Sequence, residues 1–490
     1  MNNSYDVIVV GGGGSGLAAA VAAADVGAKV LLLEKNPSLG GSTSISIGSF
    51  SAANSSFQRA AGIRDNPDDF TEDIGKFAPQ WESRNNVELR LLLAQHSSET
   101  LEWLRSLGLE FYGPSPEPPN RVPRMHNVIP NAKAYIAVMH WHVLRRNVIL
   151  RTNARVARLV TNATGRVIGV RLESGEEIIA RRGVVLAAGD YSNNRDIKAR
   201  YVPRPVADIP GINPTATGDG HELGASVGGA LLNMDVLLGP QIRFIAPSSK
   251  PFSQLLPSTP WLARLMGWGT SLLPKLVIRA MTKQLLVTWQ HPEDALYEHG
   301  AILVNKRGER FTDEKQGNLA LVIAQQPERH AFIILNKRLG DMYSKSPHYI
   351  STAPDIAYAY LPDYKRLRSD IYRQGNTLPE LAQRAGLPVE RFVQTIAELA
   401  KSQPDWNEGP WYSLGPAVSW IVLSEGGLRV DAQMRVLRAD ASVIPGLYAA
   451  GSNGQGGIMI WGHGLHIAWA FTSGRLAGTN AAQHSVFERE

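Results

Sequence analysis

A Gly-x-Gly-x-x-Gly pattern at residues 11–16 constrains this chain more than any other feature. Residues 5–10 are mostly β-branched and apolar and predict a strand, residues 17–26 are Ala-rich and predict a helix, and residues 28–33 predict a second strand. Glycines so placed allow a tight turn, close approach of the backbone to a pyrophosphate, and close packing of helix on strand. The second strand ends at Glu34, which is placed to accept hydrogen bonds from a ribose 2′-hydroxyl. These residues predict a βαβ unit that binds an adenosine-containing dinucleotide.

Two further glycine-rich segments favour a long cofactor. Residues 40–44 read Gly-Gly-Ser-Thr-Ser, and their N–H and hydroxyl groups are placed to follow the cofactor onward from its pyrophosphate. Near the other end, residues 449–451 and 456–457 precede a predicted helix that begins near Leu465. The dipole of that helix would stabilise negative charge on a reduced isoalloxazine ring. A cofactor that contacts both ends of the chain favours FAD over NAD.

The composition narrows the chemistry and the partners. None of the 490 residues is cysteine, so the chain has no disulfide, thiolate-bound zinc, iron–sulfur cluster or c-type haem of its own. The net charge of +6 is modest, and no basic stripe interleaved with aromatic residues indicates nucleic-acid binding. The sequence offers neither a secretory signal pattern nor a long uncharged apolar run, and we expect a cytoplasmic protein.

The rest of the sequence predicts an α/β chain that contains one unusual segment, in which the only charged side chains are Lys and Arg. The expected elements are helices over 88–107, 381–385 and 389–399, a Pro-rich loop over 114–130, and strands over 155–160, 167–172 and 177–186 that form a β-meander. Residues 236–291 contain no Asp or Glu, six Lys or Arg and six prolines, between apolar runs. Such a segment is typical of a substrate lid or of a peripheral membrane contact. The alternative is a connection that packs on a core and leaves its lysines in solvent.

With these segments and six more, the sequence resembles the fumarate reductase and 3-ketosteroid dehydrogenase family of FAD-dependent flavoproteins. The additional matching stretches are residues 184–189, 217–220, 300–311, 426–428, 444–451 and 474–478, spread over nearly the whole chain. The resemblance implies a Rossmann-like α/β FAD-binding domain in two parts, 1–237 and 418–490. An inserted α+β capping domain would occupy 238–417, with the active site between the cap and the flavin.

The resemblance and the glycine-rich segments together predict the cofactor contacts. These are Gly11, Gly13, Gly14, Ser15, Gly16, Glu34, Lys35, Gly41, Ser42, Thr43, Ala188, Gly189, Asp219, Gly451, Ser452, His466 and Ile467. No histidine lies within residues 40–48, where covalently flavinylated relatives attach FAD, so we expect noncovalent FAD. His463 and His466 stand three residues apart, but no third ligand is near in sequence, and no metal site is predicted.

The reaction that the resemblance implies is hydride transfer between flavin N5 and a carbon near an activating carbonyl, coupled to proton transfer. Relatives that act on fumarate or succinate bind the carboxylates with arginines, and His463 stands at one of those arginine positions. The histidine expected within residues 423–425 is also absent. A buried carboxylate without a bidentate partner is costly to bind. These departures favour a hydrophobic cyclic ketone, such as a 3-ketosteroid, over a dicarboxylate.

His463 is the first candidate catalytic group, because an imidazole can hydrogen-bond or protonate a substrate carbonyl, with the Gly464 N–H as a second donor. His466 is expected at the pyrimidine edge of the flavin. The cap should supply an acid or base, and Tyr412 is preferred for it over Tyr343 and Tyr297. The expected substrate contacts are Trp461, Tyr112, His126 and Tyr297. For each of these side chains, ordinary core packing is the alternative interpretation.

Three functions stay open on these residues. The first is α,β-desaturation of a hydrophobic cyclic ketone, and the second is reduction of an unsaturated acid or enone by the reverse reaction. The third is a flavin-bearing electron-transfer subunit that docks on a membrane through residues 236–291. Since the chain has no iron–sulfur cluster or c-type haem of its own, we expect an external electron partner, such as a quinone or a separate reductase.

Overall fold

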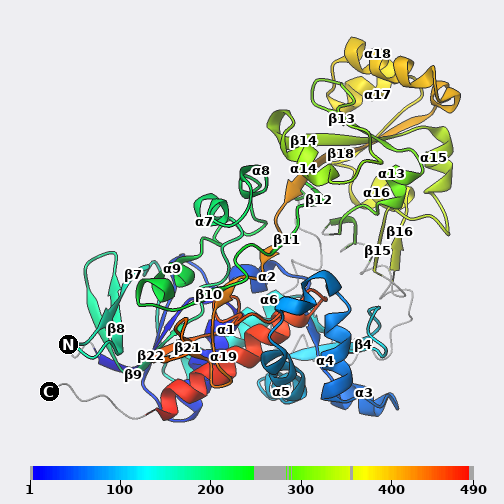
Figure 1. Cartoon of the computed structure of the whole chain (residues 1–490). Coiled ribbons are helices and arrows are strands. Elements are labelled where there is room, and N and C mark those ends of the chain that lie inside the picture. Colours follow the sequence, from blue (N-terminus) through cyan, green and yellow to red (C-terminus); the bar gives the residue numbers. More distant parts are fainter. Residues whose placement is uncertain (1–3, 248–282, 284–285, 289, 354–356, 485–490) are drawn as a thin grey trace.

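The computed structural model describes residues 4–247, 283, 286–288, 290–353 and 357–484. These residues form two lobes (Figure 1), which we call the large lobe and the cap lobe. The largest buried apolar cluster includes Val7 near one chain end and Ala482 near the other, so the large lobe contains both ends of the chain. A second cluster, with members from Ile242 to Ala417, forms the core of the cap lobe.

An eight-stranded sheet is the centre of the large lobe. Its strands are β1 (Ser4–Val10), β2 (Val30–Leu33), β6 (Ile149–Arg151), β7 (Val156–Thr161), β8 (Val167–Leu172), β9 (Glu177–Leu186), β21 (Arg435–Leu437) and β22 (Val443–Ala449). The order is β21-β22-β9-β1-β2-β6, and β8 pairs with β9 and β7. The ladders that join β6, β2, β1, β9 and β22 are parallel. The predicted meander is present, and its last strand is itself a central strand of the parallel sheet.

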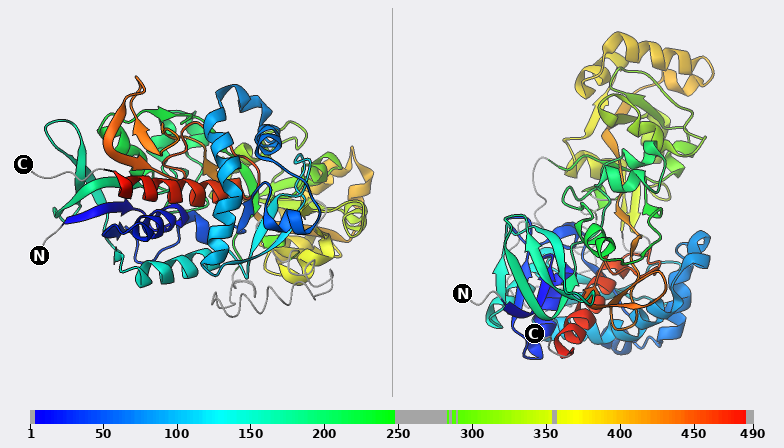
Figure 2. Two further views of the ribbon diagram at one scale, coloured as in Figure 1. Left: turned by 90° about the horizontal axis from the view of Figure 1, so that it is seen from below. Right: turned by 60° about the vertical axis from the view of Figure 1, so that its left-hand side comes forward.

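Two parallel helices cross this sheet with their backbones in close contact. They are α1 (Gly14–Asp25) and α19 (Leu465–Gln483), and Figure 2 shows them side by side. A Cβ on Gly474 would lie 2.3 Å from the Ser15 oxygen, and one on Gly478 would lie 2.1 Å from the Ala19 oxygen. Gly474 lies beside Ser15, but it is nine residues from the start of α19, whereas Ser15 is one residue from the start of α1. The N-terminus of α19 therefore extends about eight residues, or about 12 Å, past the N-terminus of α1.

Shorter elements surround the two helices. The helices are α2 (Gly41–Ile45), α3 (Ser56–Ala60), α4 (Pro67–Gly75), η1 (Pro79–Arg84), α5 (Val87–Ser106), α6 (Lys133–Arg145), α7 (Arg195–Ala199), α8 (Arg204–Ala207) and α9 (Asp219–Ser226). A small antiparallel sheet has the order β3 (Ser49–Ser51), β5 (Met125–Ile129), β4 (Glu110–Ser115). The prediction of a loop over 114–130 was therefore wrong for β5, a fully buried strand that lacks the alternating pattern of a half-exposed one.

The cap lobe is built on a five-stranded antiparallel sheet. It contains β12 (Gln241–Phe244), β18 (Trp411–Trp420), β14 (His330–Leu335), β13 (Ile302–Asn305) and β17 (Tyr372–Gly375), and β15 (Ser351–Ala353) pairs separately with β16 (Ala357–Ala359). The helices are α13 (Ala295–Glu298), α14 (Leu319–Ala324), η2 (Pro327–Arg329), α15 (Lys337–Met342), α16 (Leu361–Leu367), α17 (Leu378–Ala385), α18 (Val389–Ala400) and η3 (Pro404–Asn407).

The chain passes between the lobes twice, in opposite directions. Two short ladders mark the crossing: β10 (Leu231–Leu232) pairs with β20 (Gly427–Leu428), and β11 (Leu237–Leu238) pairs with β19 (Leu423–Ser424). The domain boundaries at 237/238 and 417/418 stay a prediction.

Most of the basic segment 236–291 lies outside the described residues. Its described part includes β11, β12 and the buried Val287 in the cap core. Among the described residues, no helix is both long and apolar enough to cross a membrane.

Candidate active site

A cavity of about 400 Å³ runs through the large lobe to the cap lobe. At one end it is lined by Glu34, at the carboxyl end of β2, and at the other by His463, just before α19. Arg243 and His291 line it from the cap lobe. The cavity therefore joins the predicted adenosine site to the space between the lobes.

The glycine turn at the N-terminus of α1 leaves this cavity open to an anion. A Cβ on Gly16 would lie 1.8 Å from the Gly11 oxygen, so helix and strand pack as closely as the pattern predicts. Gly13 caps α1 without any side-chain hydrogen bond, and a Cβ there would meet nothing closer than 3.9 Å. Uncapped N–H groups at a helix N-terminus bind phosphate well. The turn thus fits a pyrophosphate.

Glu34 is positioned for a ribose at the same end. Its side chain is buried, and its oxygens accept hydrogen bonds from Gly12 N at 2.7 Å and from Asn36 N at 2.8 Å. These bonds fix the carboxylate at the cavity wall, where a ribose hydroxyl can donate to it. Together with the open glycine turn, this arrangement fits the adenosine diphosphate half of FAD.

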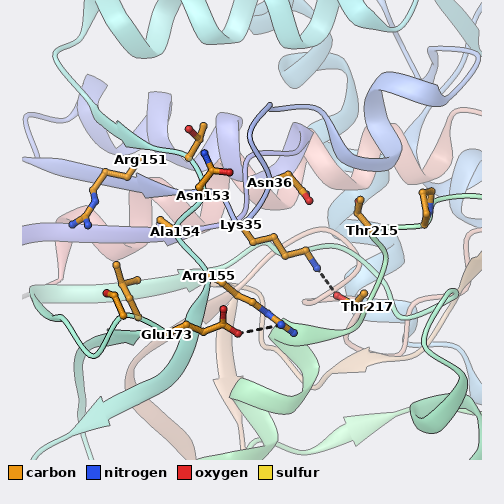
Figure 3. A pocket seen from close by; sticks show the side chains of 13 residues that line it. Lys35, Asn36, Arg151, Asn153, Ala154, Arg155, Glu173, Thr215 and Thr217 are labelled. Carbon is orange, nitrogen blue, oxygen red and sulfur yellow. Dashed lines mark hydrogen bonds and ion pairs between the residues drawn. The ribbon is translucent and has the colours of Figure 1, made fainter.

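Of the seventeen predicted cofactor residues, all except Gly16 line the cavity, and Gly16 serves the helix–strand contact instead. Lys35 and Asp219 lie 3.3 Å apart as an ion pair, and Arg155 also pairs with Asp219. Figure 3 shows this region, where a second hollow of about 530 Å³ opens beside the adenosine end. Lys35 donates to Thr217 there, so this cation is already held by protein groups.

The other end of the cavity contains the N-terminus of α19. Gly464 caps this helix with a positive φ of 77° and without a side-chain hydrogen bond. A Cβ on Gly464 would lie 2.9 Å from Ser51 N, so β3 packs directly against the cap residue. His466 and Ile467 follow in the first turn and line the cavity. If the pyrophosphate of an extended FAD lay at the glycine turn, these residues would hold its isoalloxazine ring.

His463 forms a short contact with a carboxylate that comes from a distant part of the chain. Its Nδ1 lies 2.6 Å from Glu117 Oε1, and its backbone N–H donates to the same oxygen at 2.7 Å. Glu117 is buried, whereas the His463 side chain is 53% exposed in the space between the lobes. The hydrogen bond to Glu117 raises the pKa of His463 above its usual value, although burial opposes the shift. The pair therefore favours an imidazolium whose Nε2 stays available to a substrate.

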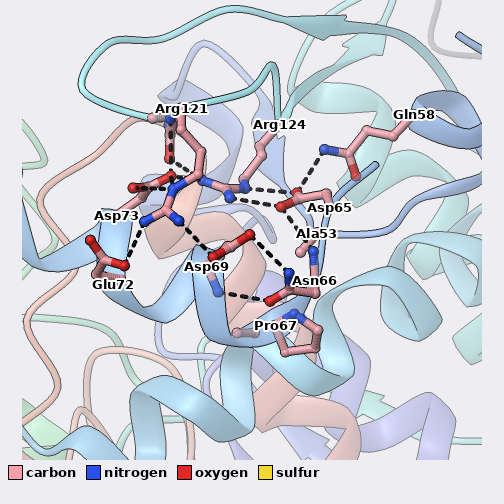
Figure 4. Close-up of polar contacts among 12 residues, drawn as sticks. Ala53, Gln58, Asp65, Asn66, Pro67, Asp69, Glu72, Asp73, Arg121 and Arg124 are labelled. Carbon is pink, nitrogen blue, oxygen red and sulfur yellow. Dashed lines mark hydrogen bonds and ion pairs between the residues drawn. The ribbon is translucent and has the colours of Figure 1, made fainter. Parts of the chain in front are cut away.

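The loop that carries Glu117 is held by a cluster of charged side chains, of which Arg121 is exposed and the others are largely buried (Figure 4). Arg124 is fully buried and binds Asp73 at 2.5 Å and Asp65 at 2.7 Å. Arg121 also binds Asp73, through its backbone N–H at 2.9 Å and its guanidinium at 3.0 Å. Burial opposes ionisation of Asp73, but the hydrogen bonds from Arg121, Lys76 and Arg124 lower its pKa well below the usual range. We call Arg121, Arg124, Asp65 and Asp73 the loop clamp.

The cap lobe contributes two basic side chains to the same cavity. Arg243 on β12 donates to Gln241 Oε1 at 3.1 Å, and burial lowers its pKa to about 10. Burial also lowers the pKa of His291, and the nearby charges of Arg243 and His463 act in the same direction. Near neutral pH, Arg243 is therefore cationic while His291 is neutral. Leu238 and Trp461 add apolar side chains to the wall of the same cavity.

Four side chains that were predicted to bind substrate or transfer a proton do not line this cavity: Tyr412, Tyr297, His126 and Tyr112. Tyr412 packs in the cap core, where a Cβ on Gly340 would lie 2.2 Å from its ring, and burial raises its pKa. Tyr297 is buried in the same core. His126 is fully buried, hydrogen-bonded to Ser55 at 2.9 Å, and burial lowers its pKa to about 4.

Tyr112 lies on β4, outside the cavity lining, and the second-choice Tyr343 bonds to His299 at 2.9 Å in the cap core. By contrast, His463, Gly464, His466 and Trp461 all line the cavity.

Sequence reasoning missed four charged or polar groups: Glu117, Glu425, Arg243 and His291. Glu117 lies in the Pro-rich loop and Glu425 directly before a glycine pair, where neither position has a recognisable motif. Arg243 and His291 stand near the two ends of the basic segment 236–291. The excess of Lys and Arg in that segment is the sequence feature that could have indicated cationic groups at the site. Among the described residues, no cluster of three or more His, Asp or Glu could hold a metal ion.

Comparisons with known proteins agree with this geometry. A family model described as FAD binding domain matches residues 6–245 and 274–461. Fumarate reductase (cytochrome) of Shewanella frigidimarina is 28% identical over 498 residues, which cover 99% of this chain and 78% of that protein. Vinyl phenol reductase of Lactiplantibacillus plantarum is 25% identical, over 99% of this chain and 97% of that protein.

Among solved structures, the open conformation of a flavocytochrome c3 fumarate reductase is 26% identical with a TM-score of 0.73, over 98% of this chain and 78% of that one. The 3-ketosteroid-Δ4-(5α)-dehydrogenase of Rhodococcus jostii RHA1 in complex with 4-androstene-3,17-dione has a TM-score of 0.60. That enzyme is 22% identical over 98% of this chain and 97% of its own, and it shares the fold. This chain therefore belongs to the family described as FAD binding domain, and is an FAD-dependent oxidoreductase of the fumarate reductase type.

Proposed function

We propose that the protein reduces a C–C double bond conjugated to a carbonyl group in a largely apolar substrate, either an enone or an unsaturated acid. The observation that carries this proposal is the His463–Glu117 pair, which holds an imidazolium at the flavin end of the cavity. FAD, bound noncovalently by the residues that line the cavity, would supply the hydride at its N5. An external quinone or reductase would supply the electrons.

His463 would act as the hydrogen-bond donor and acid. Because Glu117 occupies Nδ1, the donor that remains for a substrate carbonyl is Nε2. Glu117 holds the ring in place and stabilises its proton, and the loop clamp holds Glu117. A positioned acid of this kind typically contributes a factor of about 10²–10⁴ to the rate.

Arg243 and His291 would bind the substrate from the cap lobe. The cationic Arg243 can take a carbonyl oxygen or one carboxylate, and the neutral His291 can donate or accept a hydrogen bond beside it. The other arginine among the described lining residues, Arg155, is engaged by Asp219 at the adenosine end. Arg243 is thus the one arginine among the described lining residues at the cap-lobe end of the cavity, which supports a substrate with a single carboxylate or ketone.

The proton-transfer group that lines the cavity supports reduction over desaturation. Desaturation requires a base that removes a proton α to the carbonyl, and no tyrosine lines the cavity among the described residues. An imidazolium is instead ready to donate. Both curated relatives named above are reductases.

The proposal can be tested with chemically reduced, FAD-loaded protein under anaerobic conditions. We expect 2-cyclohexenone or cinnamate to restore the yellow flavin absorbance rapidly, and fumarate to do so at least tenfold more slowly. Rapid reoxidation by fumarate alone would refute the substrate class. Release of free FAD by acid precipitation would confirm noncovalent binding, whereas flavin that stays in the pellet would contradict it.

A second candidate is α,β-desaturation of a hydrophobic cyclic ketone such as a 3-ketosteroid. The apolar cavity wall at Leu238, Val422, Leu423 and Trp461 favours it. In this case the oxidised protein should lose its flavin absorbance when mixed with the saturated ketone, and should react with enones much more slowly.

A further inference from the structure

The outer side of helix α6 is unusually apolar for a surface that faces solvent. The inner side of α6 packs in the core of the large lobe, beside α1 and away from α19 (Figure 2). The outer side carries four exposed residues at helical spacing, namely Ala137, Trp141, Leu144 and Arg145. The Trp141 side chain is 48% exposed and the Leu144 side chain is 56% exposed. We call these four residues, together with Lys133 one turn before them, the α6 face.

Other exposed apolar side chains belong to segments that adjoin α6. Val26 directly follows α1, Ile45 ends α2 and Ile149 begins β6, and each of these three elements packs against α6. Eight large apolar side chains are exposed among the described residues, and these three together with the two on α6 make up most of them. Single exposed apolar side chains are ordinary on a protein surface, but a group of them marks an interaction site.

The charge on α6 is entirely positive. Residues 118–172, which include α6, contain ten Lys or Arg and no Asp or Glu. On the α6 face, the Arg145 guanidinium lies over the Trp141 ring, 4.6 Å from its centre. An acid from another segment, Asp25, reaches the end of the helix, but it pairs with Arg146 at 2.5 Å, outside the face. The α6 face therefore combines apolar side chains with positive charge.

This combination fits an anionic bilayer better than an acidic protein. Tryptophan and leucine bury their apolar atoms at the boundary between headgroups and acyl chains, while arginine and lysine extend to the phosphates. A peptide partner, by contrast, is usually held in a groove. Neither of the two cavities described above includes a residue of α6.

We propose that the α6 face docks the protein on an anionic lipid bilayer, with Trp141 and Leu144 between the headgroups and with Lys133 and Arg145 at the phosphates. The same helix is joined to the cavity wall, because Tyr135 donates to the Gly48 oxygen at 3.0 Å and Gly48 lines the cavity. Docking through α6 would therefore bring the cavity close to the phase into which an apolar substrate or a quinone partitions. The inference goes beyond the proposed reaction and does not depend on it.

The test is flotation of FAD-loaded protein with lipid vesicles in a density gradient. We expect the protein to float with vesicles made of equal parts of phosphatidylcholine and phosphatidylglycerol, and to stay at the bottom with vesicles of phosphatidylcholine alone. High salt should release the protein from the anionic vesicles, because salt screens the attraction between exposed charges.

Substitutions locate the contact on the protein. Arg145→Gln should weaken partition about fivefold, which is the effect of one basic residue near an anionic surface. Trp141→Ser should weaken it about tenfold, because the apolar ring is lost. Tyr201→Ser and Arg391→Gln are the matched controls, since they change an aromatic residue and a cation that are exposed elsewhere, and both should float as the wild type does. All four variants should keep their flavin, because none of these side chains lines the cavity.

The inference would be overturned if the wild type failed to float with anionic vesicles, or if Trp141→Ser and Arg145→Gln floated as well as the wild type. Retention of the protein on immobilised polyglutamate without any binding to vesicles would overturn it in favour of an acidic protein partner.

Discussion

Glu117→Gln is the sharpest test of the role of His463. Glutamine keeps an oxygen for the two His463 contacts at 2.6 and 2.7 Å but removes the negative charge. A hydrogen bond to a charged group contributes about 1.5–3 kcal/mol. Because the His463 side chain is 53% exposed, solvent screening reduces the effect to the lower limit, about 1.5 kcal/mol. That free energy equals about one pKa unit, so the pKa of His463 should fall by about one unit in the variant.

The assay is the anaerobic reoxidation rate of reduced protein by an enone, measured between about pH 5 and 9. A proton donor is active below its pKa, so the rate should fall as the pH rises through the pKa of His463. In Glu117→Gln, this fall should occur about one unit lower, and above both pKa values the rate should be about tenfold below that of the wild type. At low pH the two proteins should agree.

Glu102→Gln is the control, because Glu102 forms an exposed ion pair with Arg105 on α5 and does not line the cavity. Coincident pH profiles for Glu117→Gln and the wild type would refute the assignment of His463 as the acid. A uniform loss of rate at every pH would point to a disturbed loop, without a change in the pKa of His463.

Three further predictions follow from the geometry. Gly16→Ala places a methyl group 1.8 Å from the Gly11 oxygen, so it should destabilise the protein by about 1–3 kcal/mol and lower the flavin content; normal flavin content with unchanged denaturation would contradict the close packing. Arg243→Gln should raise the KM for a carbonyl substrate about tenfold or more, through loss of a charged hydrogen bond, and equal KM values would remove Arg243 from the site. Asp73→Asn leaves the buried Arg124 without full compensation and should cost about 3–5 kcal/mol in urea denaturation. Folding lowers the pKa of Asp73, so the ionised carboxylate stabilises the folded protein at pH values above the pKa that it has in the unfolded chain. This stabilisation is lost as the pH falls through the pKa that Asp73 has in the folded protein. The free energy of unfolding of Asp73→Asn should lack this dependence on acid pH.

The cofactor half of the site was predictable because its signals are local. The turn at residues 11–16, the acid at Glu34 and the first turn of α19 each depend on a few adjacent residues with fixed backbone requirements. The cavity contains nearly all of the residues that these signals singled out. Strands and helices with strong periodicity, such as β8 and α5, also lie close to their predicted ranges.

The substrate half depended on contacts between distant segments. Glu117 reaches His463 across 346 positions, and Glu425 reaches His466 across 41, because the parallel helices and the small sheet bring these loops together. Tyr412 was predicted as an acid or base from its chemistry alone, but strand β18 points its side chain against the apolar core of the cap lobe.

By itself, the sequence determined a βαβ unit, a dinucleotide of FAD length and the absence of cysteine-bound redox centres, because backbone conformation and residue chemistry are local properties. Only the tertiary structure decided which carboxylate meets which histidine, and which cationic groups face the cavity. Hydrogen bonds and burial act over a few ångströms in space, and chain position does not specify that distance until the fold is complete.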